Sequence, residues 1–364
     1  MTDAPENLAY ANYDLRAADP VAQKPSIRFA FEFPELLEKF VPADKAALTA
    51  RGRSRILGMF AIFLVLIALL LASGELLLAG HESEAEAILP IPLGYIAGTL
   101  GLIGTALGLI GQSKSSPRQV WLNSRLQTET LRLFHFHFIS SRLPEIIAAS
   151  TSEELQAVYI RERHAALQKL LATLADRHAE LTRIVKRSGE IDFVDLAPAL
   201  EVQSDDIPEV AADIFGVWRR LRLDWQHGYC EAKLAHGKTA GWTPRRQEHA
   251  FTRFGWLCLG IIIVFHLTHF GHELMHLPAV VIQVGVTWTA LCALAARALE
   301  DGLQPQREVE RYEQYRANVR VSTERFESAR GLGAKLEVMR TFERTSLEEM
   351  RVFLRTHAKS RFLL

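Results

Sequence analysis

The sequence predicts an all-α membrane protein, in which four transmembrane helices form two hairpins and long cytoplasmic helices extend from them. Four apolar runs, each close to the length that crosses a bilayer, indicate the transmembrane part. Charged segments rich in helix-forming residues lie between and after these runs. No segment shows the alternation of apolar and polar residues that is typical of a strand.

The four apolar runs are long enough to be transmembrane helices. An α-helix rises about 1.5 Å per residue, so about 20 apolar residues are needed to cross the hydrocarbon core. About 50 largely polar residues precede the first run, and we therefore do not expect a cleaved signal peptide. The runs are ILGMFAIFLVLIALLLA after Arg55, and residues 88–111, 254–270 and 277–296.

Lys and Arg flank the four runs on one side only. The two short connections, AGHESEAEA and GHELMH, contain neither residue type. By the positive-inside rule, both termini are expected in the cytoplasm, with the two connections outside. The flanking residues are Arg51, Arg53, Arg55, Lys114, Arg118, Arg245, Arg246, Arg253, Arg297, Arg307 and Arg311.

Composition excludes several functional classes. Lys+Arg and Asp+Glu are both 42, so no overall basic surface is available for a nucleic-acid partner. The three cysteines are too far apart for a C-x-x-C site or a disulfide framework, and we expect reduced thiols. The charged segments contain no phosphate-binding glycine loop, nucleophile elbow or paired carboxylates. We therefore expect no cofactor and no enzymatic activity.

The order of segments predicts five parts. The helical pattern in the middle includes residues 151–188, which resemble one long amphipathic helix. After the fourth run, an apolar stripe suited to a helical partner contains Leu336, Met339, Phe342, Leu347, Met350 and Phe353. The parts are a mobile tail (1–25), a first two-span hairpin with its exit helix (26–140), a cytoplasmic helical middle (141–240), a second hairpin with its exit helix (241–330) and a C-terminal helix (331–364).

Each hairpin is followed by a helix with aromatic and charged residues at steps of three to four. The first set is Trp121, Arg125, Glu129 and Arg132, and the second is Tyr312, Arg316, Arg320 and Glu324, with Tyr315 directly before Arg316. This spacing places each set on one helical face. An ordinary solvated charged face next to the membrane is one interpretation of it.

These features also resemble the SLATT domain, a two-transmembrane effector that associates with SMODS and SLOG domains. Tyr315-Arg316 is similar to that family's aromatic-Arg step, and Ser124-Arg125 is a weaker match. The resemblance covers roughly 50–135 and 245–330 as two tandem hairpins. It implies a membrane pore that acts in bacterial conflict systems after a nucleotide signal. The chain shows no nucleotide-binding domain, so a signalling nucleotide or a separate sensor protein is the expected trigger.

Span two contains a stripe of glycines. At about 100° per residue, its members fall within roughly 140° of the helix circumference. Such a stripe allows a second helix to approach closely, either span one of the same chain or another subunit. The stripe consists of Gly94, Gly98, Gly101, Gly104, Gly108 and Gly111.

Span three ends in a polar stripe made of His266, His269, His272, Glu273 and His276. HELMH at 272–276 matches the H-E-x-x-H zinc-protease motif, but span four offers only Gln283, Thr287 and Thr289 nearby. A regulatory metal or proton site at His269, His272 and His276 is a second interpretation. The third is a structural or pore-lining stripe, because ionisable groups inside a membrane usually face a bundle interior or water.

Together these patterns predict a homo-oligomeric pore or ion channel in the lipid bilayer, gated by a signal through the cytoplasmic helices. The expected pore-lining or gating residues are His266, His269, His272, Glu273, His276, Gln283 and Thr287. A non-conducting scaffold that recruits a soluble partner is the alternative. An intramembrane H-E-x-x-H metalloprotease is a minor one.

Overall fold

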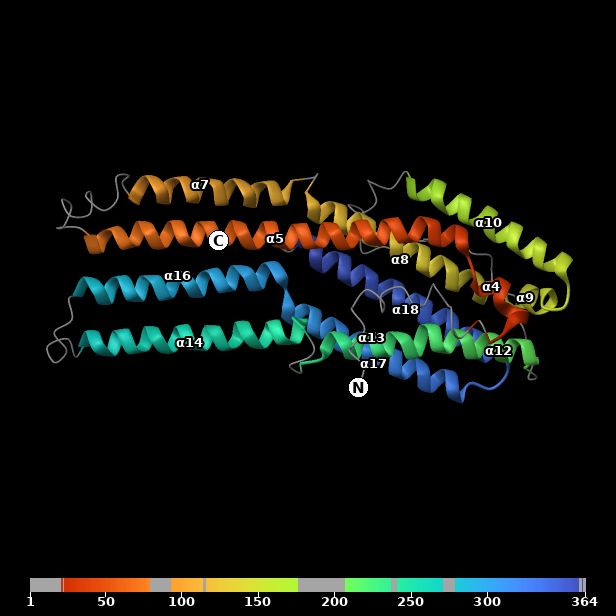
Figure 1. The fold of residues 1–364 in the computed structure, drawn as a ribbon. Helices are drawn as coiled ribbons and strands as arrows, with labels where there is room; N and C mark the ends of the chain where they lie inside the picture. Colours follow the sequence, from red (N-terminus) through yellow and green to blue (C-terminus); the bar gives the residue numbers. More distant parts are fainter. Residues whose placement is uncertain are drawn as a thin grey trace. The chain divides into compact units, whose positions relative to one another are not determined.

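The structure is a computed structural model, and every regular element that it describes is helical (Figure 1). This confirms the all-α prediction for the described residues. Those residues are 21, 23–78, 93–113, 116–175, 207–236, 241–270, 279–359 and 362.

Two compact units are each assembled from three stretches of sequence. The membrane unit contains Thr49–Val120, Pro244–Gln306 and Lys359–Leu364. The helical unit contains Met1–Leu48, Trp121–Thr243 and Arg307–Ala358. The units therefore group the expected segments by packing and not by their order along the chain.

Four helices in the described residues are long and apolar enough to span a membrane, as predicted. They are α5 (Pro34–Leu78), α7 (Leu93–Gln112), α14 (Pro244–Phe270) and α16 (Ala279–Leu303). Each of them contains a window of 18 residues that is strongly apolar, which suits lipid. Both connections between paired spans, 79–92 and 271–278, lie outside the described residues.

Small residues set the close contacts of the membrane unit. A Cβ at Gly104 of α7 would lie 2.7 Å from Val65 Cγ2 and 3.0 Å from the Ala61 carbonyl oxygen of α5. A Cβ at Gly285 of α16 would lie 2.6 Å from Phe265 of α14. The indole of Trp288 also donates a 3.0 Å hydrogen bond to Ser73 Oγ, which joins α16 to α5. Glycine thus permits close helix packing on two faces of this unit.

The helical unit surrounds one apolar core. Its main helices are α8 (Pro117–Ser141), α17 (Pro305–Ser328) and α18 (Leu332–Lys359). Shorter helices complete it: η1 (Pro25–Ile27), α4 (Arg28–Phe31), α9 (Leu143–Ala149), α10 (Glu153–Ala175), α12 (Glu209–Trp218) and α13 (Trp225–Leu234). The helix expected over 151–188 is described only as α10, and residues 176–188 lie outside the described part of the chain.

The apolar stripe of α18 is already covered by the chain itself. Leu336, Met339 and Phe342 are among the fully buried side chains of the core, and Met350 and Phe353 are buried too. Phe342 contacts the rings of Trp218 and Tyr315. These residues of the stripe are therefore covered by the chain's own helices.

A six-residue π-helix, η3 (Arg219–Asp224), joins α12 to α13. π-Helical turns are rare and insert extra residues into a helix, which changes the direction of their side chains. Here Arg222 is directed into the core, with 1% of its surface exposed.

Candidate functional site

The two exit-helix motifs are buried inside the helical unit, contrary to a solvated charged face. Trp121 lies 4.8 Å from the ring of His357 and 5.7 Å from that of Phe353, measured between centroids, and both partners belong to α18. Tyr312 and Tyr315 belong to the same core. Arg125, Glu129 and Arg316 are partly exposed, and Arg316 forms a 2.9 Å ion pair with Glu231 of α13. Most of the motif is therefore part of the packing that closes this unit.

Glu129 is the centre of the first motif. Arg125 and Arg132 each lie 2.6 Å from its Oε1 atom, one turn before and one turn after it. Burial alone would raise the pKa of this carboxyl, but the two guanidinium groups, with a contribution from Arg222, lower the pKa to about 2. Arg132 also lies over the ring of Phe40 on α5, at 5.3 Å from its centroid. The charges thus connect α8 to the first part of α5.

A second ionic cluster surrounds Glu308, at the start of α17. His357 Nε2 lies 2.9 Å from one carboxylate oxygen of Glu308, and Arg311 lies 3.0 Å from the other. Burial would raise the pKa of Glu308, yet Arg311 and His357 hold it well below its usual value. Arg311 also pairs with Glu349 of α18. Two helices are therefore joined by alternating charges that are almost completely removed from solvent.

The third cluster is a buried Arg–Glu pair between η3 and α18. Arg222 donates two hydrogen bonds to Glu343, at 2.9 and 2.6 Å. Its guanidinium lies 4.6 Å from the centroid of Phe136, so it stacks on an aromatic face as well. The hydroxyl of Tyr315 lies 3.1 Å from Ser346 Oγ, one turn from Glu343 on α18. Tyr315 therefore lies next to this ion pair.

Together the three clusters form a polar network inside the apolar core, named here the buried ionic network. A buried charge is costly unless a partner neutralises it, so such a network fixes one arrangement of its helices. Only part of it is predictable from the sequence, because Arg222, Glu308, Glu343 and His357 have no distinctive spacing. The members are Arg125, Glu129, Arg132, Arg222, Glu308, Arg311, Glu343, Glu349 and His357.

The glycine stripe is only partly a contact surface within the chain. Gly101 and Gly104 face Ala68 and Val65 of α5, and Gly94 and Gly111 lie at ordinary distances from Glu75 and Leu57. A Cβ at Gly98 would meet no atom of the described residues within 4 Å. The stripe therefore supports packing against span one at its centre and leaves open space at Gly98.

The polar stripe of span three is described only at its start. His266 is on α14 with its side chain exposed, and His269 belongs to the same helix. His272, Glu273 and His276 lie outside the described residues. Among the residues that the structure does describe, no group of three potential ligands could hold a metal ion. The zinc-protease and metal-site interpretations remain untested at HELMH.

Two threonine hydroxyls of span four form hydrogen bonds within their own helix. Thr287 Oγ1 donates to the Gln283 carbonyl oxygen at 2.8 Å, and Thr289 Oγ1 donates to the Gly285 carbonyl oxygen at 2.8 Å. Both bonds stay within α16. The side chains of Gln283 and Thr287 are exposed on the membrane unit. The interhelical bond of this span comes instead from Trp288.

The fold and its four apolar helices define a class: an all-α protein of the multi-pass membrane type. No family model, curated protein or solved structure matches the chain, so its particular function rests on its own residues.

Proposed function

We propose that this protein is a homo-oligomeric membrane pore or ion channel, gated through its helical unit. The main support is the exposure of His266, Gln283 and Thr287 on helices that are otherwise apolar. A polar or ionisable side chain in contact with lipid is costly, and such residues usually face other helices or a water-filled path. In an oligomer, neighbouring copies of the chain would provide the other helices and would enclose the water-filled path.

The amount of uncovered span surface agrees with assembly. Between 6% and 22% of each apolar window is buried within the chain, with the lowest value for α14, the helix of His266. The remaining surface is available to lipid and to other copies. An assembly in which α14 and the exposed face of α16 turn inward would place these polar groups along one path.

The gate would be the buried ionic network. A signalling nucleotide or a separate sensor protein that disturbed its charge balance would change the packing of α8, α17 and α18, and repacking of the spans would follow. We propose that such a pore acts in a bacterial defence system, in the inner (plasma) membrane with both termini in the cytoplasm, and the resemblance to tandem SLATT hairpins supports this role. The burial of the α18 stripe speaks against the form of scaffold in which that stripe recruits a partner.

A membrane-potential assay on expressing cells tests the pore. Wild type is compared with His266→Leu plus Gln283→Leu, and with Leu267→Ala as the control, because Leu267 is also exposed on α14 but apolar. Depolarisation by the wild type and the control, with at least a severalfold loss in the double variant, would support the proposal. An unchanged potential in all three, at equal membrane expression, would favour the non-conducting anchor.

A further inference from the structure

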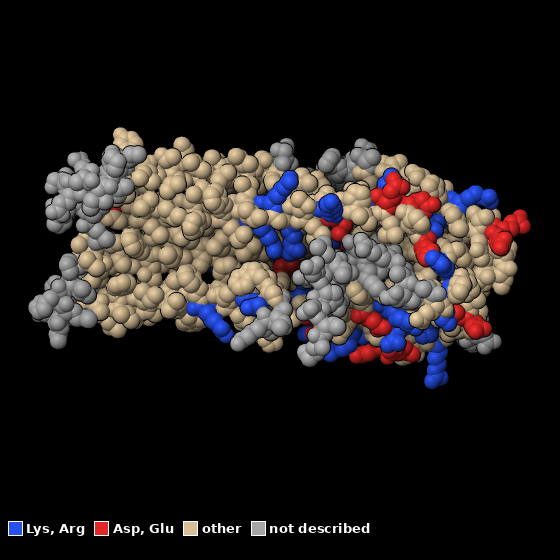
Figure 2. Space-filling view, in the orientation of Figure 1, with Lys and Arg blue, Asp and Glu red and all other residues tan. Residues whose placement is uncertain are grey.

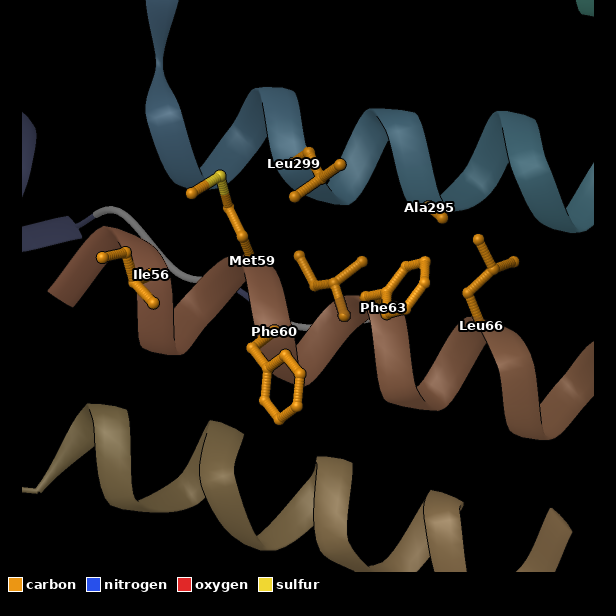
Figure 3. A pocket seen from close by; sticks show the side chains of 8 residues that line it. Ile56, Met59, Phe60, Phe63, Leu66, Ala295 and Leu299 are labelled. Atoms are coloured by element: carbon orange, nitrogen blue, oxygen red, sulfur yellow. The ribbon is translucent and has the colours of Figure 1, made fainter. Parts of the chain in front are cut away.

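An apolar groove lies between α5 and α16 of the membrane unit (Figure 3). Its volume is about 400 Å³. Ile56, Met59, Phe63 and Leu66 line it from α5, and Ala295 and Leu299 line it from α16. Every lining residue is apolar, and the large side chains of Ile56, Phe60 and Phe63 remain more than half exposed. The groove is therefore an open apolar surface on the membrane part of the chain.

The groove has a defined floor. Ile62, Ala295 and Ala298 form a small buried cluster against which Leu66, Leu299 and Phe362 pack. From α16 the lining contains only the small Ala295 and the rim residue Leu299, which leaves the groove unfilled. A flexible hydrocarbon would fill it and gain dispersion contacts with both helices.

One end of the groove meets positive charge. Ile56 directly follows Arg55, and Arg53 lies seven residues, or about two turns, before Phe60, on the same helical face. The side chain of Arg53 is exposed. Figure 2 shows a broad surface without charged side chains in this part of the molecule, and Lys and Arg side chains gathered at one end of it. A groove that is apolar along its length and cationic at its mouth has the polarity of an anionic phospholipid.

We propose that the groove binds an acyl chain of an anionic phospholipid, whose phosphate contacts Arg53. The charge distribution argues for lipid rather than a second copy of the chain in this groove. Copies in one membrane share an orientation, so a second copy would bring the same arginines to the same depth. Cations would then face cations, whereas a phosphate neutralises them. Lipid binding at this site does not require that the protein conduct ions. The binding experiment therefore tests the site independently of the proposed pore.

Native mass spectrometry of the full chain in detergent tests the site with two added lipids, phosphatidylglycerol and phosphatidylcholine of identical acyl chains. Wild type is expected to retain phosphatidylglycerol preferentially. Removing one surface arginine in Arg53→Ala should reduce that preference about fivefold. Arg320→Ala is the matched control, because Arg320 is an exposed arginine of the helical unit. It should leave the preference unchanged.

Leu299→Trp fills the groove from its rim and should reduce retention of both lipids, with Met59→Trp as a second variant if the first does not fold. Equal retention of the two lipids by wild type would overturn the proposal. So would an Arg320→Ala effect as large as that of Arg53→Ala. A dimer that appears as lipid is stripped, and that Leu299→Trp abolishes, would assign the groove to a second copy.

Discussion

His357 Nε2 and Glu308 Oε1 lie 2.9 Å apart, and both side chains are at least 97% buried. The pair joins the last turn of α18 to the first turn of α17, and the His357 ring also packs against Trp121 and Phe353. One side chain therefore connects a buried carboxylate, an exit-helix aromatic and the end of the long C-terminal helix. This position explains why Trp121 is buried and why the exit helices belong to the core.

Replacement of His357 by alanine should destabilise the helical unit. The change removes a hydrogen bond to a buried carboxylate and leaves a cavity among aromatic rings, with an expected cost of about 3 kcal/mol. His357→Gln keeps a donor and should cost about half as much. Thermal unfolding of the full chain in detergent measures both. Equal midpoints for the two variants would contradict a role for the Glu308 hydrogen bond.

The stability of the protein should fall strongly when only one partner of the Arg222–Glu343 pair is removed. Arg222→Met or Glu343→Leu alone leaves an uncompensated buried charge, with an expected cost of about 3–5 kcal/mol. The double variant removes both charges and should regain most of that stability. A thermal double-mutant cycle measures the coupling. Additive losses would show that the ion pair is not the source of the effect.

Acid should destabilise the protein through His135. Burial, with Arg163 and Arg222, lowers the pKa of His135 to about 3, whereas an unfolded histidine titrates near about 6.5. The folded state therefore holds the neutral ring, and its contribution to stability is complete above about pH 6.5 and is lost as the pH falls toward 3. The expected slope is about 1.4 kcal/mol per pH unit. Unfolding midpoints between pH 7 and pH 5 measure it.

His135→Phe provides the test of that assignment. Neither ring nitrogen of His135 has a hydrogen-bond partner among the described residues, and the ring lies 4.9 Å from that of Phe136. An apolar ring should therefore be tolerated and should weaken the acid sensitivity. His137, whose pKa is lowered to about 4 by burial and by Arg340 and Arg344, should retain part of it. An unchanged pH profile in His135→Phe would exclude His135 as the main group.

Two glycines of α7 should respond differently to alanine. Gly104→Ala brings a methyl group to within 2.7 Å of Val65 and 3.0 Å of a backbone oxygen, so the α5–α7 contact must open. The expected cost is about 1–3 kcal/mol. Gly98→Ala meets no described atom within 4 Å and should be neutral or slightly stabilising, since alanine favours helix. Thermal unfolding in detergent compares them. A larger loss for Gly98→Ala would indicate that another subunit occupies the space beside it.

The effects on stability of substitutions at Gly302 and Phe362 should be coupled, because Gly58 and Gly302 both make room for the ring of Phe362. A Cβ at either glycine would overlap the ring of Phe362, which fits between α5 and α16. Gly302→Ala and Phe362→Ala should each lower stability, by about 1–3 kcal/mol. Once the ring is gone, Gly302→Ala should cost little, so the double variant should be less unstable than the sum of the two. Additive losses would place Phe362 elsewhere.

The helical class and the four helices long and apolar enough to span a membrane were predictable from residue composition alone. Those features depend on local composition: a run of about 20 apolar residues has few stable alternatives to a membrane helix, as the 56–72 run shows. The centre of the glycine stripe was also predictable, because Gly101 and Gly104 show their shared face through spacing alone. The polar stripe at 266–276 is the part of the prediction that lies mostly outside the described residues.

The packing of the charged helices could not be predicted without the three-dimensional structure. Trp121, Tyr312 and the α18 stripe looked suited to a solvated face and a foreign partner, and they are buried against one another. The reason is that Arg222, Glu343, Glu308 and His357 neutralise each other across 121 and 49 residues of sequence. Gly302 is a similar case: it sits near the end of α16 and makes room for Phe362, while Gln304 takes the positive φ of 53° where the helix ends. Long-range charge pairing and space for a distant ring leave no periodic signal in the sequence.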